Sequence, residues 1–543
     1  MDISFSAYSA GLFADPGSGF SLDVSRISLP EEFLTEQQPQ ADRALREMRE
    51  IESGALANHN ERRMVGHYWL RSPERAPSAM IREDIEQTIR AIKEFADGVR
   101  SARLLSSTGQ RFTRTHIIGI GGSALGPQFV ADSLVSATDR MRVSFFDNTD
   151  PDGMERVLLD REFRLSETLV LVVSKSGGTK ETRNGELVMK RVLQSAGISW
   201  PSHFVAITGQ GSELDKRAQE EGWLARFPMW DWVGGRTSEL SAVGLLPAAL
   251  QGVAIDQLLA GAAHLDSLSR RSAIRENPAM MLALAWFRAG NGQGDRAMVV
   301  LPYKDRLQLF SRYLQQLVME SLGKELDRDG NRVNQGIVVY GNKGSTDQHA
   351  YVQQLRDGRD DFFVTFLEAL EDGGDGRRSG AALIKTKDVE VEPGVFPGDY
   401  LFGFLYGTRA ALTQQGRPSI VVTIPRVDEF SIGLLIALFE RAVGFYASFV
   451  NINAYDQPGV EAGKQAADRI LAIQKSLSDF FSGHADARAL SMIEVCRDTD
   501  LVGHEEIVFQ ILRRWAANGK GSMTNVHRPG DAQYLHSVRR PSE

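Results

Sequence analysis

Apolar runs and polar stretches alternate along the middle of this chain in the pattern of strands connected by helices. Short apolar runs predict strands at 116–119, 142–147, 168–173 and 203–208, with helical stretches between them. That alternation indicates βαβ units, which place parallel strands in one sheet with helices on both faces. The pattern predicts an α/β fold.

A second set of the same kind follows a helical region at 252–288. Its predicted strands lie near 297–302, 337–340, 362–366 and 418–424. We therefore expect two doubly wound α/β/α sandwich domains, the first at residues 111–255 and the second at residues 256–480.

The segments that flank these domains have helical patterns. In residues 1–110, apolar side chains from Ile85 to Phe95 fall on one helix face, so we expect a helical segment that packs on the larger domain. Residues 481–543 predict a helical extension, with two helices and a turn at Asn518-Gly519 in a winged-helix-like arrangement. Acidic residues offset much of its positive charge, which favours packing or an oligomer contact over nucleic-acid binding.

Composition narrows the class of protein. The 543 residues are 42% hydrophobic and 24% charged, and the net charge of −8 argues against a general surface for nucleic acid or anionic membranes. Cys496 is the single cysteine, so no intrachain disulfide can form, and the first residues lack a signal-peptide pattern. The apolar stretch 430–450 contains Glu440 and Arg441, which favours a buried core helix over a membrane span. We expect a cytoplasmic protein.

The strongest sign of chemistry is the stretch LVLVVSKSGGTKET at 169–182. A buried strand ends there in a loop of hydroxyls, glycines and Lys175, which leads into a helix start. Backbone amides, a positive helix end and hydroxyl donors together form an anion site. The alternative is an ordinary strand-to-helix turn, in which serine and glycine are common. No Walker pattern is present, so a phosphate monoester is favoured over a nucleoside triphosphate.

A glycine-rich loop follows the first predicted strand. Gly119, Gly121 and Ala124 fit a GxGxxA dinucleotide fingerprint, and Asp147 ends the next strand, so a nicotinamide-dependent dehydrogenase is an alternative. Glycines of this kind also serve any turn that brings backbone near a ligand. The loops at 119–126 and 174–179 follow neighbouring strands, so together they fit one small phosphorylated ligand held between them.

Six segments, in chain order, resemble the glucose-6-phosphate isomerase family. They are GIGGSALGP from Gly119, VVSKSGGTKET from Val172, WDWVGGR from Trp230, QLVMES from Gln316, the pair Gln348-His349, and QPGVEAGK from Gln457. The resemblance implies two sugar-isomerase (SIS) domains and interconversion of an aldose and a ketose phosphate through a cis-enediolate. It also implies a homodimer whose active site is shared between subunits, and no cofactor. A regulatory protein that binds sugar phosphate without turning it over is the alternative.

The chemistry of such an isomerisation assigns roles to four residues. Glu320, one helical turn after Gln316, is the expected base, although a helix glutamate taken alone is usually a solvated surface residue. Arg236 follows two glycines and would stabilise the enediolate, unless it serves only in a salt bridge. The resemblance implies that His349, from the partner subunit, opens the sugar ring together with Lys464. Without the resemblance, His349 would be a hydrogen-bonded turn residue and Lys464 a solvated surface lysine.

The resemblance also assigns substrate-binding positions. Gly122, Ser123, Gln316 and Gln457 are expected at the sugar, and Ser174, Lys175, Ser176 and Thr179 at the phosphate. No metal-binding spacing such as HExxH occurs, and the positive charge of Arg236 and the phosphate loop removes the need for a metal.

The chain departs from the family pattern at three places. Ser176 replaces a threonine and keeps the hydroxyl, and Pro458 replaces a tryptophan beside Gln457. Asp347 stands two residues before His349, where it would favour the charged imidazole if it approached the ring.

Overall fold

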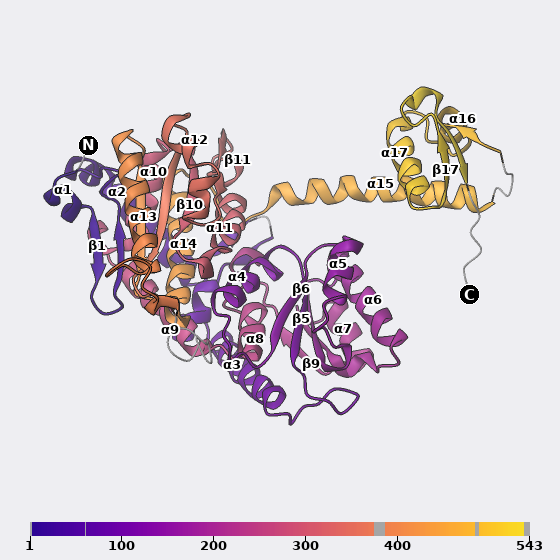
Figure 1. Cartoon of the computed structure of the whole chain (residues 1–543), viewed down its shortest axis with the longest axis horizontal. Coiled ribbons are helices and arrows are strands. Elements are labelled where there is room, and N and C mark those ends of the chain that lie inside the picture. The colour runs from indigo at the N-terminus through magenta and orange to yellow at the C-terminus, as the bar shows by residue number, and fades with distance from the viewer. Residues whose placement is uncertain (1–2, 60, 374–385, 484–487, 537–543) are drawn as a thin grey trace. The chain divides into compact units, whose positions relative to one another are not determined.

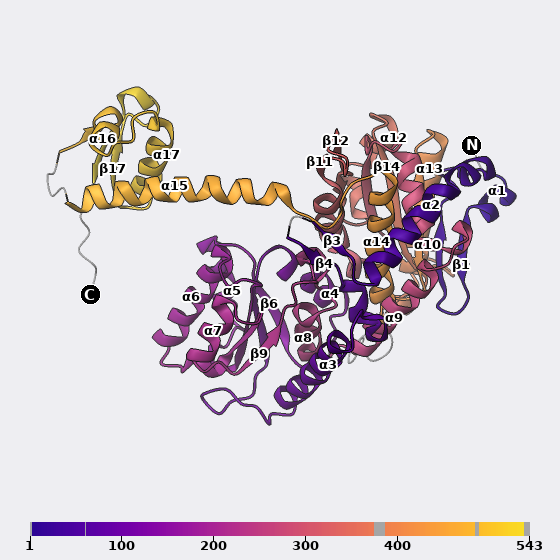
Figure 2. The same cartoon turned by 180° about the vertical axis from the view of Figure 1, so that it is seen from behind.

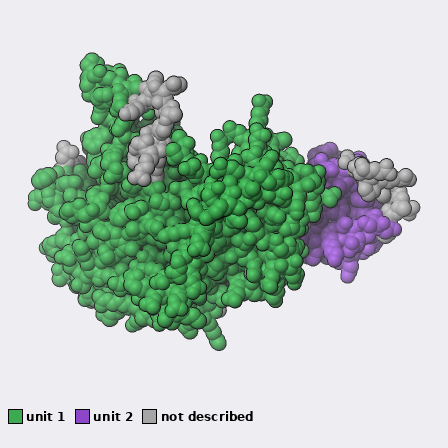
Figure 3. All heavy atoms as spheres, turned by 90° about the horizontal axis from the view of Figure 1, so that it is seen from below, with its two compact units in different colours: residues 1–456 green, residues 457–543 purple. Residues whose placement is uncertain are grey.

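The computed structural model describes residues 3–59, 61–373, 386–483 and 488–536, apart from the side chains of residue 458 and residues 460–465. The chain divides into two compact units, residues 1–456 and 457–543 (Figure 3). We describe each unit by itself.

The first sheet of unit 1 is built from five parallel strands in the order β6-β5-β7-β8-β9 (Figure 1). The strands are β5 (Arg114–Ile118), β6 (Arg142–Phe146), β7 (Thr168–Val173), β8 (Phe204–Thr208) and β9 (Ala225–Pro228). All four predicted strands are confirmed. The fifth strand, β9, was not predicted, because the four residues ARFP alternate too briefly to show a period.

Helices cover both faces of this sheet. Alternate residues of β7 face opposite sides: Leu169, Leu171 and Val173 share a core with α3, α4 and α8, whereas Val170 and Val172 pack with α5, α6 and α7. The helices are α3 (Ala79–Arg100), α4 (Leu125–Ser133), α5 (Pro151–Leu158), α6 (Lys180–Ser195), α7 (Glu213–Glu220) and α8 (Ala242–Gln251). In this strand order the switch point lies between β5 and β7, where ligands bind in such folds.

The second sheet has the order β1-β2-β15-β14-β10-β13. Its four parallel strands were predicted and are confirmed as β10 (Ala297–Pro302), β13 (Val339–Tyr340), β14 (Phe362–Ala369) and β15 (Ser419–Ile424). The N-terminal segment is mainly helical, as expected, but it also supplies the antiparallel hairpin β1 (Leu12–Asp15) and β2 (Phe20–Asp23), which extends this sheet beside β15 (Figure 2). Strands of four residues are too short for the sequence pattern to reveal.

Helices also cover both faces of the second sheet. Those of one face, α9 (Ile255–Ser269), α10 (Pro278–Ala289) and α14 (Glu429–Phe449), pack against Met298, Val300 and Val422. On the other face, α12 (Val352–Asp357) and α13 (Pro397–Gln414) pack against Val299, Leu301 and Val421. The predicted α/β fold, with helices on both faces of each sheet, is therefore confirmed, whereas the division at residue 255 stays a prediction, because residues 1–456 form one compact unit.

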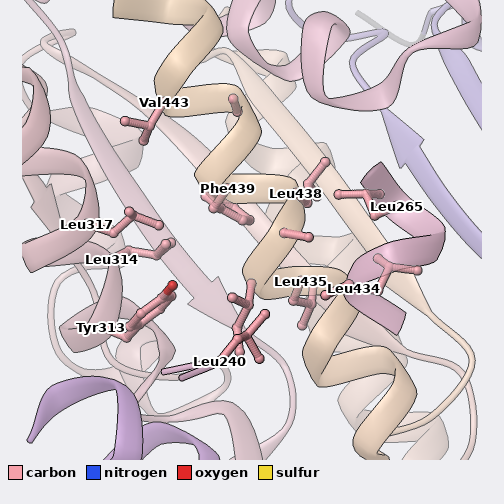
Figure 4. Close-up of a cluster of buried hydrophobic side chains, with 14 of the residues drawn as sticks. Leu240, Leu265, Tyr313, Leu314, Leu317, Leu434, Leu435, Leu438, Phe439 and Val443 are labelled. Atoms are coloured by element: carbon pink, nitrogen blue, oxygen red, sulfur yellow. The ribbon is translucent and has the colours of Figure 1, made fainter. Parts of the chain in front are cut away.

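Helix α14 is the central core helix (Figure 4). It is long and apolar enough to span a membrane, but 89% of its most apolar window is buried inside the protein, as the sequence predicts. Glu440 and Arg441 in its middle are paired with charged groups of other elements. Arg441 donates to Asp266 at 2.8 Å, and Arg71 donates to Asp266 at 2.9 Å and also bonds Glu440. Such pairing makes charges tolerable inside a core.

Unit 2 has its own apolar core, formed by residues such as Leu477, Phe481, Leu512 and Tyr534. Its elements are α15 (Pro458–Gly483), β16 (Leu490–Ser491), α16 (Met492–Asp498), α17 (Glu505–Ala517), β17 (Gly521–Thr524) and β18 (Gln533–His536). The predicted pair of helices and wing is present, and the hairpin β17–β18 forms the wing of a three-stranded sheet with β16. Helix α15 runs across residue 480, where we expected the extension to begin.

Candidate active site

The loop after β5 touches two other parts of unit 1. A β-carbon on Gly122 would lie 1.8 Å from the carbonyl oxygen of Gly235, so no side chain fits there. Ser238 Oγ donates to the Gly122 carbonyl at 3.3 Å. A β-carbon on Gly121 would lie 3.2 Å from Gln316 Nε2. Close packing therefore explains Gly122, and a left-handed backbone conformation, with φ of 58°, explains Gly121, so neither glycine requires a dinucleotide.

The loop after β7 is organised by its own hydroxyls. Ser174 Oγ accepts from the Gly177 amide at 3.1 Å and donates to Thr179 Oγ1 at 3.3 Å, and Ser176 Oγ accepts from the Gly178 amide at 3.1 Å. Thr179 precedes α6, but its side chain does not cap the helix. The positive end of a sixteen-residue helix thus stands behind an exposed Ser176. This geometry suits a phosphate group.

Lys175 connects this loop to the segment before Arg236. Its Nζ donates to the carbonyl oxygens of Asp231 at 2.9 Å and Val233 at 3.1 Å. Burial and the charge of Arg63 lower the pKa of Lys175 to about 8, against the opposing effect of Asp231. The expected contact between Lys175 and a phosphate stays a prediction.

Arg236 is buried, with 5% of its surface exposed, in the short helical turn η6 (Gly235–Thr237). Its Nη2 donates to the Asp456 carbonyl at 3.0 Å, and its Nη1 donates to Ser321 Oγ at 3.4 Å. Burial lowers the pKa of Arg236, whereas the nearby carboxylates of Glu320 and Asp456 raise it. A guanidinium beside the predicted base suits stabilisation of an oxyanion.

Glu320 and Gln316 lie on a π-helical segment, η9 (Gln315–Glu320), which continues α11 (Phe310–Leu314). The sequence predicts a helix here but not this widened turn, which is frequent at functional sites. Leu314 and Leu317 hold the segment against α14 (Figure 4). Glu320 is half-buried, and its Oε2 is buried without a hydrogen-bond partner among the described residues. That oxygen is free to accept a proton.

Ser123 is half-buried at the end of the helical turn η3 (Gly121–Ser123). The structure thus brings together the loop of Gly122 and Ser123, Gln316, Arg236 and Glu320 within unit 1.

His349 lies at an exposed position, at the end of the short turn η10 (Thr346–His349). The Asp347 carboxylate accepts from the amides of Asn342 at 2.9 Å and Lys343 at 3.0 Å, and from the Tyr351 hydroxyl at 2.6 Å. Asp347 therefore orders its own loop, and the structure gives no bond between it and the imidazole of His349.

Two predicted residues belong to unit 2. Gln457 is its exposed first residue, and Lys464 lies in α15 with its side chain outside the described part of the structure. Their roles at the sugar stay predictions.

The sequence did not single out several groups beside Arg236. A cavity of about 50 Å³ is lined by Lys175, Arg236 and residues of the N-terminal segment, including Glu61 and His67. His67 is fully buried, and neither ring nitrogen has a partner among the described residues. Nothing in the sequence distinguishes these positions. Larger hollows of about 700 and 420 Å³ lie around Gln251 and Asp139, away from the loops described above.

Lys324 was also missed. Its Nζ donates to the carbonyl oxygens of Glu320 at 3.0 Å and Ser321 at 2.9 Å, and it lies 3.6 Å from Asp456 Oδ1. A lysine shortly after a helix end is common on protein surfaces, so the sequence gave no indication that Lys324 is buried near the site.

Comparison with known proteins gives consistent results. The phosphoglucose isomerase family model matches residues 23–377 and 408–490. The chain is 58% identical over 516 residues to a glucose-6-phosphate isomerase of Geobacter sp. strain M21, covering 94% of both chains. It is 54% identical over 529 residues to that of Synechococcus elongatus, covering 97% and 98%. The crystal structure of a glucose-6-phosphate isomerase from Chlamydia trachomatis is similar, with a TM-score of 0.76 and 27% identity over 87% of this chain and 92% of that one.

Proposed function

The chain belongs to the phosphoglucose isomerase family, and from this premise we propose that it interconverts D-glucose 6-phosphate and D-fructose 6-phosphate at the site that contains Glu320 and Arg236. This reaction serves glycolysis and gluconeogenesis. A cytoplasmic location, where those sugar phosphates occur, is part of the proposal.

The observation that carries the proposal is the unpartnered, buried Glu320 Oε2 beside the guanidinium of Arg236. With the sugar ring open, the Glu320 carboxylate takes the proton from C2 of the aldose. The C2–H electron pair forms the C1–C2 double bond, and the carbonyl oxygen becomes an enediolate oxygen. Arg236 stabilises that negative charge. The proton on O2 moves to the enediolate oxygen O1. The C1–C2 double-bond pair then takes the proton back from Glu320 at C1, and the C2–O bond becomes the carbonyl of the ketone.

The loops at the switch point supply the binding energy in this proposal. Ser174, Ser176 and Thr179 surround the N-terminus of α6, where the phosphate would lie. In this proposal Ser123 and Gln316 bind hydroxyls of the sugar between that phosphate and Glu320. Anchoring the phosphate holds C2 near the base, which lowers the entropic part of the barrier.

The proposal includes a homodimer that shares its active sites. Helix α13 has an exposed stripe formed by Tyr400, Gly403, Phe404 and Gly407. Nothing lies within 4 Å of a β-carbon built on either glycine, so packing within the chain does not require them. Glycine inside a helix costs about 0.5–1 kcal/mol relative to alanine, so a close-packed partner helix would account for the pair.

His349 lies next to this stripe. The preceding residue, Gln348, donates from Nε2 to the Phe404 carbonyl at 3.0 Å, so η10 rests on α13. In the proposed dimer, His349 enters the site of the second copy. There it would transfer the proton of the ring oxygen, together with Lys464.

The test is consumption of fructose 6-phosphate, coupled to a glucose-6-phosphate dehydrogenase that forms a nicotinamide signal. We expect robust turnover by the unmodified protein and none above background by Glu320→Gln. Binding of fructose 6-phosphate without turnover by the unmodified protein would support the alternative of a regulatory sugar-phosphate sensor. Turnover that survives Glu320→Gln would place the base elsewhere.

Sharing between subunits has its own test. Glu320→Gln and His349→Ala homodimers should both be inactive, whereas dimers formed by mixing and reassembling them should regain activity. Each mixed dimer would contain one site with both residues intact. A mixture that stays inactive after verified subunit exchange would contradict sharing.

A further inference from the structure

Lys324 contacts the backbone of the turn that carries the proposed base, Glu320. It is the first residue of the short strand β11 (Lys324–Leu326), directly after the helix that carries Glu320 ends at Leu322 and Gly323. Only 5% of its side chain is exposed. A buried lysine is unusual, because removing an ammonium from water is unfavourable unless partners replace the water.

The partners of Lys324 are the proposed active-site elements. Its Nζ donates to the backbone carbonyl oxygens of Glu320 and Ser321, at 3.0 and 2.9 Å. The carboxylate of Asp456 lies 3.6 Å away, and the carbonyl of the same Asp456 accepts from Arg236 at 3.0 Å. Lys324 therefore connects the helix end of the base to the segment that holds the guanidinium.

We propose that Lys324 is a positioning residue of the isomerase, which fixes Glu320 relative to Arg236. This inference rests on the proposed function, because it concerns the same base.

The positioning follows from the geometry. The last carbonyl groups of a helix have no partner within the helix, and here one ammonium satisfies two of them. Glu320 belongs to that last turn, so movement of the turn would displace the carboxylate. A displacement of about 1 Å lowers a rate by roughly 100-fold in positioned reactions.

The charge of Lys324 suits the helix end, because the carbonyl oxygens there carry partial negative charge that a cation offsets. The charged groups that face the ammonium are Arg236, Asp456 and Glu320. Burial and Arg236 lower the pKa of Lys324 to about 8, while Asp456 and Glu320 oppose them. The cation is therefore present at neutral pH and is lost as the pH rises through about 8.

Substitution of Lys324 provides the test, with the full-length protein and the coupled assay from pH 5 to 10. For Lys324→Met we expect kcat to fall about 10- to 100-fold with a smaller change in KM, since substrate contacts remain. Lys324→Arg should lose the basic limb of the kcat profile near pH 8, because arginine stays charged.

Lys93→Met is the matched control. Lys93 is exposed on α3 and pairs with Asp256, so its removal should leave kcat unchanged across the whole pH profile. If Lys324→Met fails to fold, as judged by circular dichroism, then Lys324→Arg and Asp456→Asn provide the test through the basic limb of the kcat profile. Asp456→Asn should lower kcat and move the basic limb to lower pH, since the carboxylate favours the charged lysine.

The outcomes separate the two claims. An unmodified protein without isomerase activity would overturn the proposed function itself. An active protein in which the folded Lys324 variants keep the kcat and the basic limb of the unmodified protein would overturn the role of Lys324 alone.

Discussion

Gly122 and Gly235 are in direct contact: a β-carbon built on Gly122 would lie 1.8 Å from the Gly235 carbonyl oxygen. The glycine-rich loop after β5 thereby lies against the turn that holds Arg236. This contact joins two segments that are more than a hundred residues apart in the chain, and it sets the distance between the proposed sugar-binding loop and the guanidinium.

Gly122→Ala tests that contact. We expect the added methyl group to push the two loops apart and to lower kcat/KM by at least about 100-fold, because the catalytic groups would be displaced. Steady-state kinetics and thermal melting measure the two effects. Gly17→Ala is the control, since its β-carbon meets only Asp15 at 3.8 Å, an ordinary contact. Equal activity of both variants would show that the contact does not position the site.

Asp266→Asn tests the buried ion cluster under the core helix α14. Asp266 is fully buried between Arg71 and Arg441, and removing one charge leaves the guanidinium groups under-compensated. We expect the free energy of unfolding to fall by about 3–5 kcal/mol. Asp256→Asn removes an exposed partner of Lys93 and should change stability by less than about 1 kcal/mol. Urea unfolding of both variants measures the difference, and similar losses would contradict the account.

The same cluster predicts sensitivity to acid. Burial alone would raise the pKa of Asp266, but Arg441 and Arg71 hold it well below its usual value of 3.8. The unfolded chain therefore binds a proton near pH 3.8 that the folded protein does not bind. The stabilisation by Asp266 is present above that pH and is lost as the pH falls below it. Asp266→Asn should have a shallower loss of stability between pH 5 and 3 than the unmodified protein.

The sequence predicted the sheets better than the site. The run LVLVV of β7 and the apolar strands beside it can be recognised in the sequence, because buried parallel strands are continuously apolar. The hairpin β1–β2 and strand β9 were missed, since four-residue strands show no period. Glu320, Arg236 and Gly122 came from family resemblance. Their mutual contacts depend on tertiary packing, which no local pattern specifies.

Groups outside the family motifs could not be predicted at all. Lys324 and His67 are a lysine and a histidine in ordinary sequence surroundings, and only the fold buries them near Arg236. The π-helical turn at Glu320 is also invisible, because its residues are those of a regular helix.

Substitutions on α13 test the proposed dimer surface. Gly407→Arg would place a long charged side chain on the exposed stripe, where nothing within the chain opposes it. We expect a folded monomer that lacks activity, as measured by sedimentation and the coupled assay. Met80→Arg places the same charge at another apolar position that is 70% exposed and should leave the dimer intact. An active Gly407→Arg dimer would place the interface elsewhere.

Unit 2, for which the sequence suggests a winged-helix-like arrangement, has no excess of positive charge. Residues 457–543 contain eleven acidic and eleven basic residues. Nucleic-acid binding relies on an excess of lysine and arginine at phosphates, so we expect no binding of a labelled 30-base-pair duplex at about 150 mM salt. Fluorescence anisotropy measures this directly. Saturable binding that weakens with salt would contradict the expectation.

The most direct test of the central claim follows the hydrogen at C2. Glucose 6-phosphate that carries deuterium at C2 is incubated with the protein in ordinary water, and mass spectrometry records the loss or transfer of the label. The account predicts that the unmodified protein moves the label from C2, whereas folded Glu320→Gln, with substrate bound, leaves it in place. Loss of the label from C2 at the same rate in both proteins would show that Glu320 is not the base.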